Sequence, residues 1–172
     1  MSRDNNQFSQ EDVKIIKDLA KQGNAKAQHN LGAMFLNGQG VEKNIAEAIN
    51  WFRQAAEQGL VTAQHNLGTI YLQGEELAAD SIEAAHWFTK AAMQGDPRSQ
   101  YSLGALYFEG LGVERNLEKA YIWISLALQQ VPEDRQKEVR QVRDFVASQL
   151  SPEEIEQAQI TTLDIVKSMT IH

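Results

Sequence analysis

Residues 59–95 read GLVTAQHNLGTIYLQGEELAADSIEAAHWFTKAAMQG, and this stretch decides the fold because its pattern occurs three times. At a period of 36 the chain matches itself over residues 23–130 without a gap, and nine of the 36 columns are identical in all three copies. Chance gives about one such column, so the chain is a repeat array. In the first copy the identical columns are Gly23, Gln28, Leu31, Gly32, Gly38, Ala48, Trp51, Ala55 and Gln58.

Each copy has the pattern of two helices joined by a glycine-containing loop. The first helix is expected over residues 25–37, because Ala27, Leu31 and Phe35 are spaced as one apolar helical face. Gly38 suits the left-handed backbone just past a helix end. Gly32 costs its helix roughly 1 kcal/mol relative to alanine, so its recurrence predicts that a neighbouring helix packs closely against it.

The second helix of each copy is expected to open at a polar cap, and in the first two copies it is expected to end at a glycine, Gly59 or Gly95. The cap residues are Asn44, Asp80 and Asn116. Two alanines and a tryptophan follow in every copy, and small residues beside a large indole let helices approach to about 8–10 Å. We therefore predict that Trp51, Trp87 and Trp123 are core residues and not ligand-stacking residues, and that Tyr71 and Tyr107 also belong to the core.

Both ends of the array carry helix-start signals that differ from the repeats. Ser9-Gln10-Glu11-Asp12 reads as a capping box for a helix to about Gln22. Pro132 starts a charged helix to about Leu150, and Ser151-Pro152 opens a last helix to about Met169. The expected organisation is all-α and a single domain over 1–172, with an N-terminal capping helix at 9–22, repeats at 23–58, 59–94 and 95–130, and C-terminal capping helices at 132–172.

The last predicted helix is more apolar than its polar residues balance. We expect it to cover the open face of the third repeat. An alternative is that it docks a second copy of the chain and forms a weak homodimer. Its apolar residues are Ile155, Ala158, Ile160, Leu163, Ile165, Val166 and Met169.

Composition excludes several classes of function. The net charge is −7, so a phosphate backbone is repelled and nucleic acid is not an expected partner. There is no cysteine, hence no disulfide or thiolate metal site, and no stretch of about 20 apolar residues for membrane insertion. Residues 1–12 lack the basic and apolar regions of a signal peptide, which predicts a cytoplasmic protein; a removed leader would make it periplasmic or secreted.

The repeat pattern A-x-x-x-L-G-x-x-Y, G-x-G-V and A-x-x-W-x-x-x-A-A resembles the bacterial type of the Sel-one-like repeat (SLR) family, a relative of the tetratricopeptide repeat. The resemblance covers residues 10–160 and implies a right-handed α-α superhelix that acts as an adaptor and binds a protein or peptide on its concave face. Departures are Glu75-Glu76 at a family glycine, Ser99 at an alanine and Val131 at a glycine. The second copy matches at Ala63, Leu67, Gly68, Tyr71, Ala84, Trp87, Ala91, Ala92 and Gly95.

In tetratricopeptide-like stacks the first helix of each repeat builds the inner wall, which predicts the contact residues. The residues on that helix opposite the Leu31 and Phe35 face form three rows, one in each repeat. Histidine and tyrosine would supply flat contact area, and asparagine would bond a peptide backbone. The predicted rows are Lys26, His29, Asn30 and Asn37; Thr62, His65, Asn66, Thr69 and Gln73; and Arg98, Tyr101, Ser102 and Glu109.

Two other interpretations of these residues are hydrogen bonds within the stack, which stay open, and a zinc site, which the spacing of the histidines does not favour. The histidines and asparagines could instead bond to the next helix within the stack. A zinc site is not expected, because neither His29 nor His65 has a second ligand at helical spacing. No cofactor is predicted.

Two further function classes compete with the adaptor. Some cysteine-rich members of the resembled family carry the name β-lactamase, but no serine here has a lysine three residues later, so a hydrolase is not favoured and catalytic residues are not assigned. An immunity or inhibitor protein, which blocks a partner enzyme, would have the same sequence pattern as an adaptor. The genomic neighbourhood separates these two, because an adjacent toxin or effector gene favours inhibition.

Overall fold

The structure, a computed structural model, describes residues 9–74 and 78–170, with side chains up to residue 168. All regular secondary structure in these ranges is helical, which confirms the all-α solenoid class. Three features of the sequence prediction lie outside the described part. They are the limits at residues 1 and 172, the departure at Glu75 and Glu76, and the side chain of Met169. The chain forms two compact units that meet between Ala78 and Ala79, and each is described by itself. The single domain stays a prediction.

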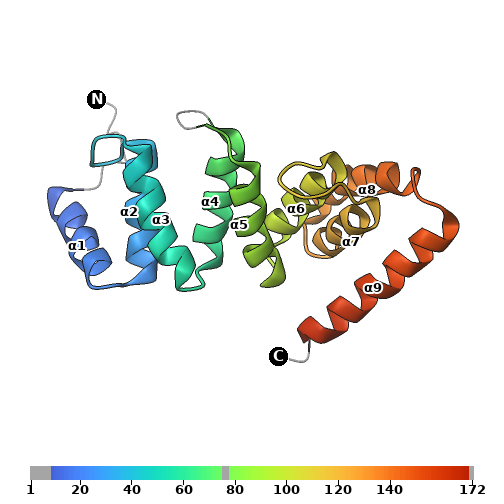
Figure 1. The fold of residues 1–172 in the computed structure, drawn as a ribbon. Coiled ribbons are helices and arrows are strands. Elements are labelled where there is room, and N and C mark those ends of the chain that lie inside the picture. Colours follow the sequence, from blue (N-terminus) through green and yellow to red (C-terminus); the bar gives the residue numbers. More distant parts are fainter. Residues whose placement is uncertain (1–8, 75–77, 171–172) are drawn as a thin grey trace. The chain divides into compact units, whose positions relative to one another are not determined.

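The first unit is a run of antiparallel helical hairpins (Figure 1). Its helices are α1 (Gln10–Lys21), α2 (Ala25–Asn37), α3 (Ile45–Glu57) and α4 (Val61–Gln73). Helix α2 packs against α1 and α3, and α3 packs against α4. Val13 and Ala20 of α1 are buried with Leu31 and Met34 of α2, so the front helix covers the first repeat as predicted.

The second unit adds two helices behind the third repeat. Its helices are α5 (Ser81–Met93), α6 (Pro97–Glu109), α7 (Leu117–Leu128), α8 (Glu133–Ala147) and α9 (Pro152–Thr170). Ile124 of α7, Val146 of α8 and Ala158 of α9 lie in one buried cluster, which confirms that the last helix packs on the third repeat. Helix α8 ends at Ala147 and not near Leu150, because Gln149 and Leu150 bond to nearby carbonyls in turns.

Local capping chemistry sets the helix boundaries, as the sequence pattern predicts. The three predicted cap side chains accept backbone N–H groups at 2.8–3.1 Å. These residues are Asn44, Asp80 and Asn116. Ser9 and Ser151 both form capping boxes, with Asp12 and Glu154 respectively. Gly38 ends α2 with φ +68°, a left-handed conformation that glycine adopts without strain.

The glycines inside the first helix of the repeats permit close approach of the second helix. A Cβ on Gly32 would lie 2.9 Å from Cδ1 of Phe52. A Cβ on Gly104 would lie 2.6 Å from Cγ1 of Ile124 and 3.1 Å from the carbonyl oxygen of Ala120. Real Cβ atoms essentially never show contacts below 3.0 Å, and each glycine would have one, so the prediction of close packing is confirmed at both glycines.

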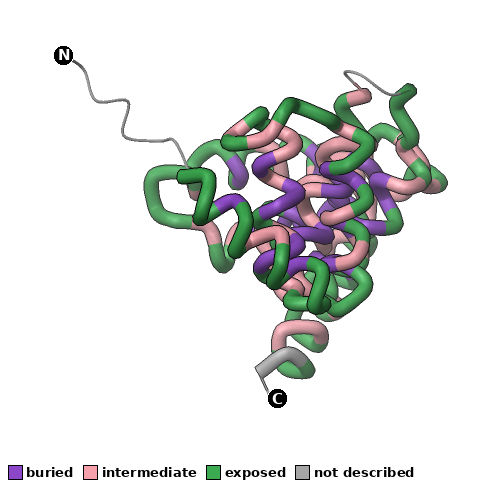
Figure 2. The backbone as a smooth tube through the Cα atoms, turned by 90° about the vertical axis from the view of Figure 1, so that its left-hand side faces the viewer, coloured by how far each residue is buried: buried purple, intermediate pink, exposed green. Residues whose placement is uncertain are grey.

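Buried residues follow one side of each helix (Figure 2). Trp87 is only 4% exposed, and its indole N–H donates to the Glu83 carboxylate at 3.1 Å, which confirms its core position. Trp51 is half-buried against the core of the first unit, and Trp123 is also half-buried. Tyr107 packs against the core of the second unit.

Candidate functional site

The predicted contact rows lie on α2, α4 and α6, and they are only partly open to solvent. The first two rows belong to the first unit and the third row to the second unit. The exposed members are Lys26, Asn30, Asn37, Thr62, Gln73, Arg98 and Glu109. The half-buried members are His29, His65, Asn66, Thr69, Tyr101 and Ser102. The exposed members are therefore the ones that a partner reaches without rearrangement.

A hydrogen bond joins the rows of α2 and α4. The side-chain amide of Asn66 lies 3.1 Å from Nε2 of His29, and Nδ1 of His29 lies 3.4 Å from Oδ1 of Asn30. An amide that donates to Nε2 requires the proton of the imidazole to be on Nδ1, where it faces the Asn30 oxygen. The His29 ring also lies 5.4 Å from the Phe52 ring. His29 and Asn66 thus bond to a neighbouring helix within the stack, as the alternative interpretation of these residues states.

The row on α6 begins at a helix cap. Asp96 accepts the backbone N–H of Ser99 at 2.9 Å and its hydroxyl at 2.7 Å, and Arg98 donates to the other carboxylate oxygen at 3.1 Å. Burial by itself raises the pKa of Asp96, but the bonds from Ser99 and the charge of Arg98 outweigh it and hold the pKa below its ordinary value of 3.8. Arg98 is thereby engaged in the cap, and Tyr101 packs against the core.

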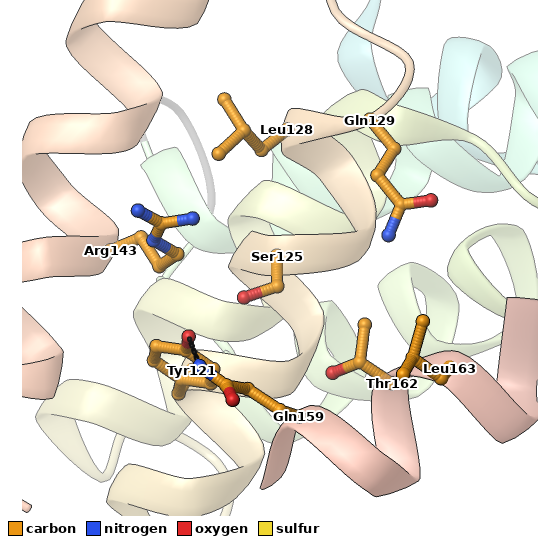
Figure 3. A pocket seen from close by; sticks show the side chains of 8 residues that line it. All are labelled: Tyr121, Ser125, Leu128, Gln129, Arg143, Gln159, Thr162 and Leu163. Atoms are coloured by element: carbon orange, nitrogen blue, oxygen red, sulfur yellow. Dashed lines mark hydrogen bonds between the residues drawn. The ribbon is translucent and has the colours of Figure 1, made fainter. Parts of the chain in front are cut away.

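The sequence did not reveal a pocket in the second unit. It lies between α7, α8 and α9, has a volume of about 310 Å³, and is drawn in Figure 3. Its polar members are a tyrosine, a serine, two glutamines, a threonine and one arginine. The lining residues are Tyr121, Ser125, Leu128, Gln129, Arg143, Gln159, Thr162 and Leu163. They come from three helices separated by turns, so no spacing within the chain marks them as a group.

The described residues form neither a metal-binding group nor a membrane-spanning helix. Across residues 9–74 and 78–170, no group of three or more histidine, aspartate or glutamate side chains could hold a metal ion. Within the described helices, none is long and apolar enough to span a bilayer.

The repeat pattern matches a known family over most of its length. Sel1 repeats match residues 25–60, 61–96 and 97–131, which is more than half of the chain. These limits start two residues after the repeat limits expected at 23, 59 and 95, and they coincide with the first residues of α2, α4 and α6. No curated protein shows significant similarity to the chain.

Solved structures show the same repeat fold. The chain is 38% identical to a Sel1 repeat protein from Oxalobacter formigenes, over 76% of this chain and 98% of that one, with a TM-score of 0.67. It is 28% identical to a protective antigen of uropathogenic Escherichia coli that displays an SLR fold, over 91% of this chain and 40% of the antigen, with a TM-score of 0.56. It is 25% identical to the Helicobacter pylori cysteine rich protein B, over 71% and 92% respectively, with a TM-score of 0.54.

Proposed function

Because the chain belongs to the Sel1 repeat family, we propose that it is an adaptor that binds a protein or peptide through the exposed residues of α2, α4 and α6. Sel1 repeat proteins generally serve as protein-interaction scaffolds and are typically not enzymes. The observation that most supports the proposal is the bond between His29 and Asn66. It links α2 to α4 at the level of the proposed contact residues.

The chemistry of this surface suits an extended peptide. Lys26 and Asn30 on α2 and Thr62 and Gln73 on α4 are exposed and present amide, hydroxyl and ammonium groups. Such groups bond to backbone carbonyl and N–H groups without demanding one side chain. In this proposal His29 and Asn66 position the helices, and their neighbours make the contacts.

We also propose a class of partner, a location and a mode of self-association for the adaptor. The net charge of −7 disfavours nucleic acid as a partner, and we keep the cytoplasm as the proposed location. A weak homodimer through α9 is consistent with Ile160 and Leu163, which are 48% and 57% exposed.

The test compares two variants with four alanines each in an affinity-capture experiment. The immobilised chain is incubated with native lysate, and retained proteins are quantified by mass spectrometry. The row variant carries Lys26→Ala, Asn30→Ala, Thr62→Ala and Gln73→Ala. The control variant carries Glu47→Ala, Asn50→Ala, Arg53→Ala and Glu57→Ala on the exposed side of α3. Unchanged circular dichroism establishes that both variants are folded.

We expect a partner that the wild type and the control retain and that the row variant loses by about tenfold or more, since several contacts are removed together. Equal retention by all three proteins would move the binding surface away from these rows. If the captured partner is an enzyme whose activity the chain suppresses, the inhibitor alternative replaces the adaptor.

A further inference from the structure

The pocket between α7, α8 and α9 contains a hydrogen-bonding group that the protein itself does not satisfy. The hydroxyl oxygen of Ser125 is buried and has no hydrogen-bond partner, and in this respect it is alone among the side chains that the structure describes. In Figure 3 Ser125 lies in the middle of the group, between Arg143 of α8 and Thr162 of α9. A buried hydroxyl without a partner is costly, so this position favours a ligand that supplies one.

The neighbours of Ser125 offer further donors. The Tyr121 hydroxyl accepts a bond from the Gln159 amide at 3.4 Å, which leaves its own proton for another acceptor. The Thr162 hydroxyl donates to the Ala158 carbonyl at 2.8 Å, so its proton is already used in a hydrogen bond. Serine and tyrosine hydroxyls therefore face the same pocket with protons to donate.

The charge of the pocket has one sign. Arg143 is the one charged residue in the pocket lining, and its side chain is 25% exposed. Two of its N–H groups donate to Oδ1 of Asp144, at 3.0 Å from Nε and 2.5 Å from Nη2. A guanidinium has five N–H donors, so three remain after this pair is formed. The preferred ligand is thus an anion with acceptor oxygens.

The remaining wall of the pocket is apolar, so it favours a ligand that carries an apolar group beside its anionic head. Leu128 and Leu163 line the pocket, and Leu163 is 57% exposed. A volume of about 310 Å³ is at the small end for ligand sites, which fits a short apolar group with one anionic head. A planar carboxylate matches the arginine fork.

We propose that this pocket, built on Ser125, Tyr121 and Arg143, binds a carboxylate with a short apolar tail. Two sources provide this chemistry, a small organic acid and the C-terminus of a peptide that ends in an apolar residue. The site is separate from the rows on α2, α4 and α6, so the alanine variant of those rows leaves pocket binding unchanged.

The test titrates N-acetyl-leucine and its uncharged partner N-acetyl-leucinamide into the full-length ¹⁵N-labelled chain, and amide chemical shifts report binding. We expect a Kd on the order of 1 mM for the acid and at least about tenfold weaker binding of the amide. The shifts should concentrate at residues 121–129, 143 and 159–163. Equal affinities, or no shifts with about 10 mM acid, would overturn the proposal, and these comparisons need no variant.

Variants separate the individual contacts. Arg143→Ala should weaken acid binding by about tenfold, and Ser125→Ala by a smaller factor of about 3–5, because only the first loses a charged partner. Asp144→Asn should strengthen binding, since it removes the competing carboxylate. Arg140→Ala is the matched control, an exposed arginine one turn away on α8. A loss at Arg140 equal to that at Arg143 would show general charge attraction and reject the site.

Octanoate and a tetrapeptide with a free C-terminal leucine distinguish the two sources. Tighter binding of the tetrapeptide identifies a chain terminus as the ligand, and tighter binding of octanoate identifies a small organic acid. Either result supports the carboxylate site, and failure of both ligands to bind would reject it.

Discussion

The glutamines in the repeat columns act as buried links between successive helices. The Nε2 of Gln28 donates to the carbonyl of Ala20 at 3.1 Å, and Gln64 donates to Ala56 at 3.0 Å in the same way. Gln100 repeats the bond with Ala92 at 3.3 Å. Each bond crosses the turn between two helices and reaches a carbonyl in the last turn of the earlier helix. The repeat column indicated that glutamine matters here, but glutamine is mostly a surface residue, so sequence alone did not predict its burial.

The Gln100→Met variant tests this link. Methionine keeps the shape of the side chain but removes both the donor to Ala92 and the acceptor for Gln130, which bonds to Gln100 at 3.2 Å. We expect the free energy of unfolding to fall by about 1–2 kcal/mol. Urea denaturation measures it. Gln22→Met is the control, because Gln22 is an exposed glutamine, and it should cost less than about 0.5 kcal/mol. Equal losses in the two variants would contradict a buried link.

For the candidate contact residues, the sequence predicts which helix face they occupy but not which groups they bond to. Helical periodicity placed His29 and Asn66 on corresponding rows. It did not decide between a partner contact and an internal bond, because the two residues are 37 positions apart and their separation in space depends on packing. The unpartnered hydroxyl of Ser125 had no sequence signal at all.

At the scale of the element, helix starts were predictable because capping is local. A side chain that accepts a backbone N–H three residues later requires only the right residue at the right place, as at Asn44 and Asn116. The end of α8 was predicted three residues late, because no glycine follows Ala147 and turns stop the helix. Ser99, a departure from the repeat pattern, has a role in the structure: it is fully buried and bonds to the Asp96 cap.

The cap of α6 makes stability depend on pH. The folded-state pKa of Asp96 lies below 3.8, so its carboxylate stabilises the fold above that pH, and the contribution disappears as the pH falls through the folded pKa. Asp96→Asn keeps a good helix cap, because asparagine is a favoured cap residue, but it removes the carboxyl group that titrates. We expect wild type to exceed the variant by about 1 kcal/mol or less at about pH 6, and the difference to be smaller at about pH 2. Urea denaturation at both pH values measures it; a difference that is constant with pH would contradict this account.

For the whole molecule, the 36-residue period predicted the solenoid and its end helices, because each repeat buries its apolar face only against neighbours. The division at Ala78 and Ala79 was not predictable. The repeat columns run through this point without a gap, so the periodicity gives no sign of a division there. The family pattern likewise indicates a mode of binding and not a ligand.

The fragment of residues 79–172 should fold without the first unit. One buried cluster joins α7, α8 and α9 through Ile124, Val146 and Ala158, all within the fragment. Solenoid stability is a sum of local and nearest-neighbour terms, so removal of the preceding repeats leaves this cluster intact. We expect cooperative thermal unfolding with a midpoint below that of the full chain, and helical circular dichroism per residue close to it. The fragment of residues 1–78, which lacks these end helices, is the comparison and should be the less stable of the two. An unstructured 79–172 fragment would mean that the second unit depends on the first for folding and that the chain behaves as one cooperative domain, as its uninterrupted repeat pattern predicts.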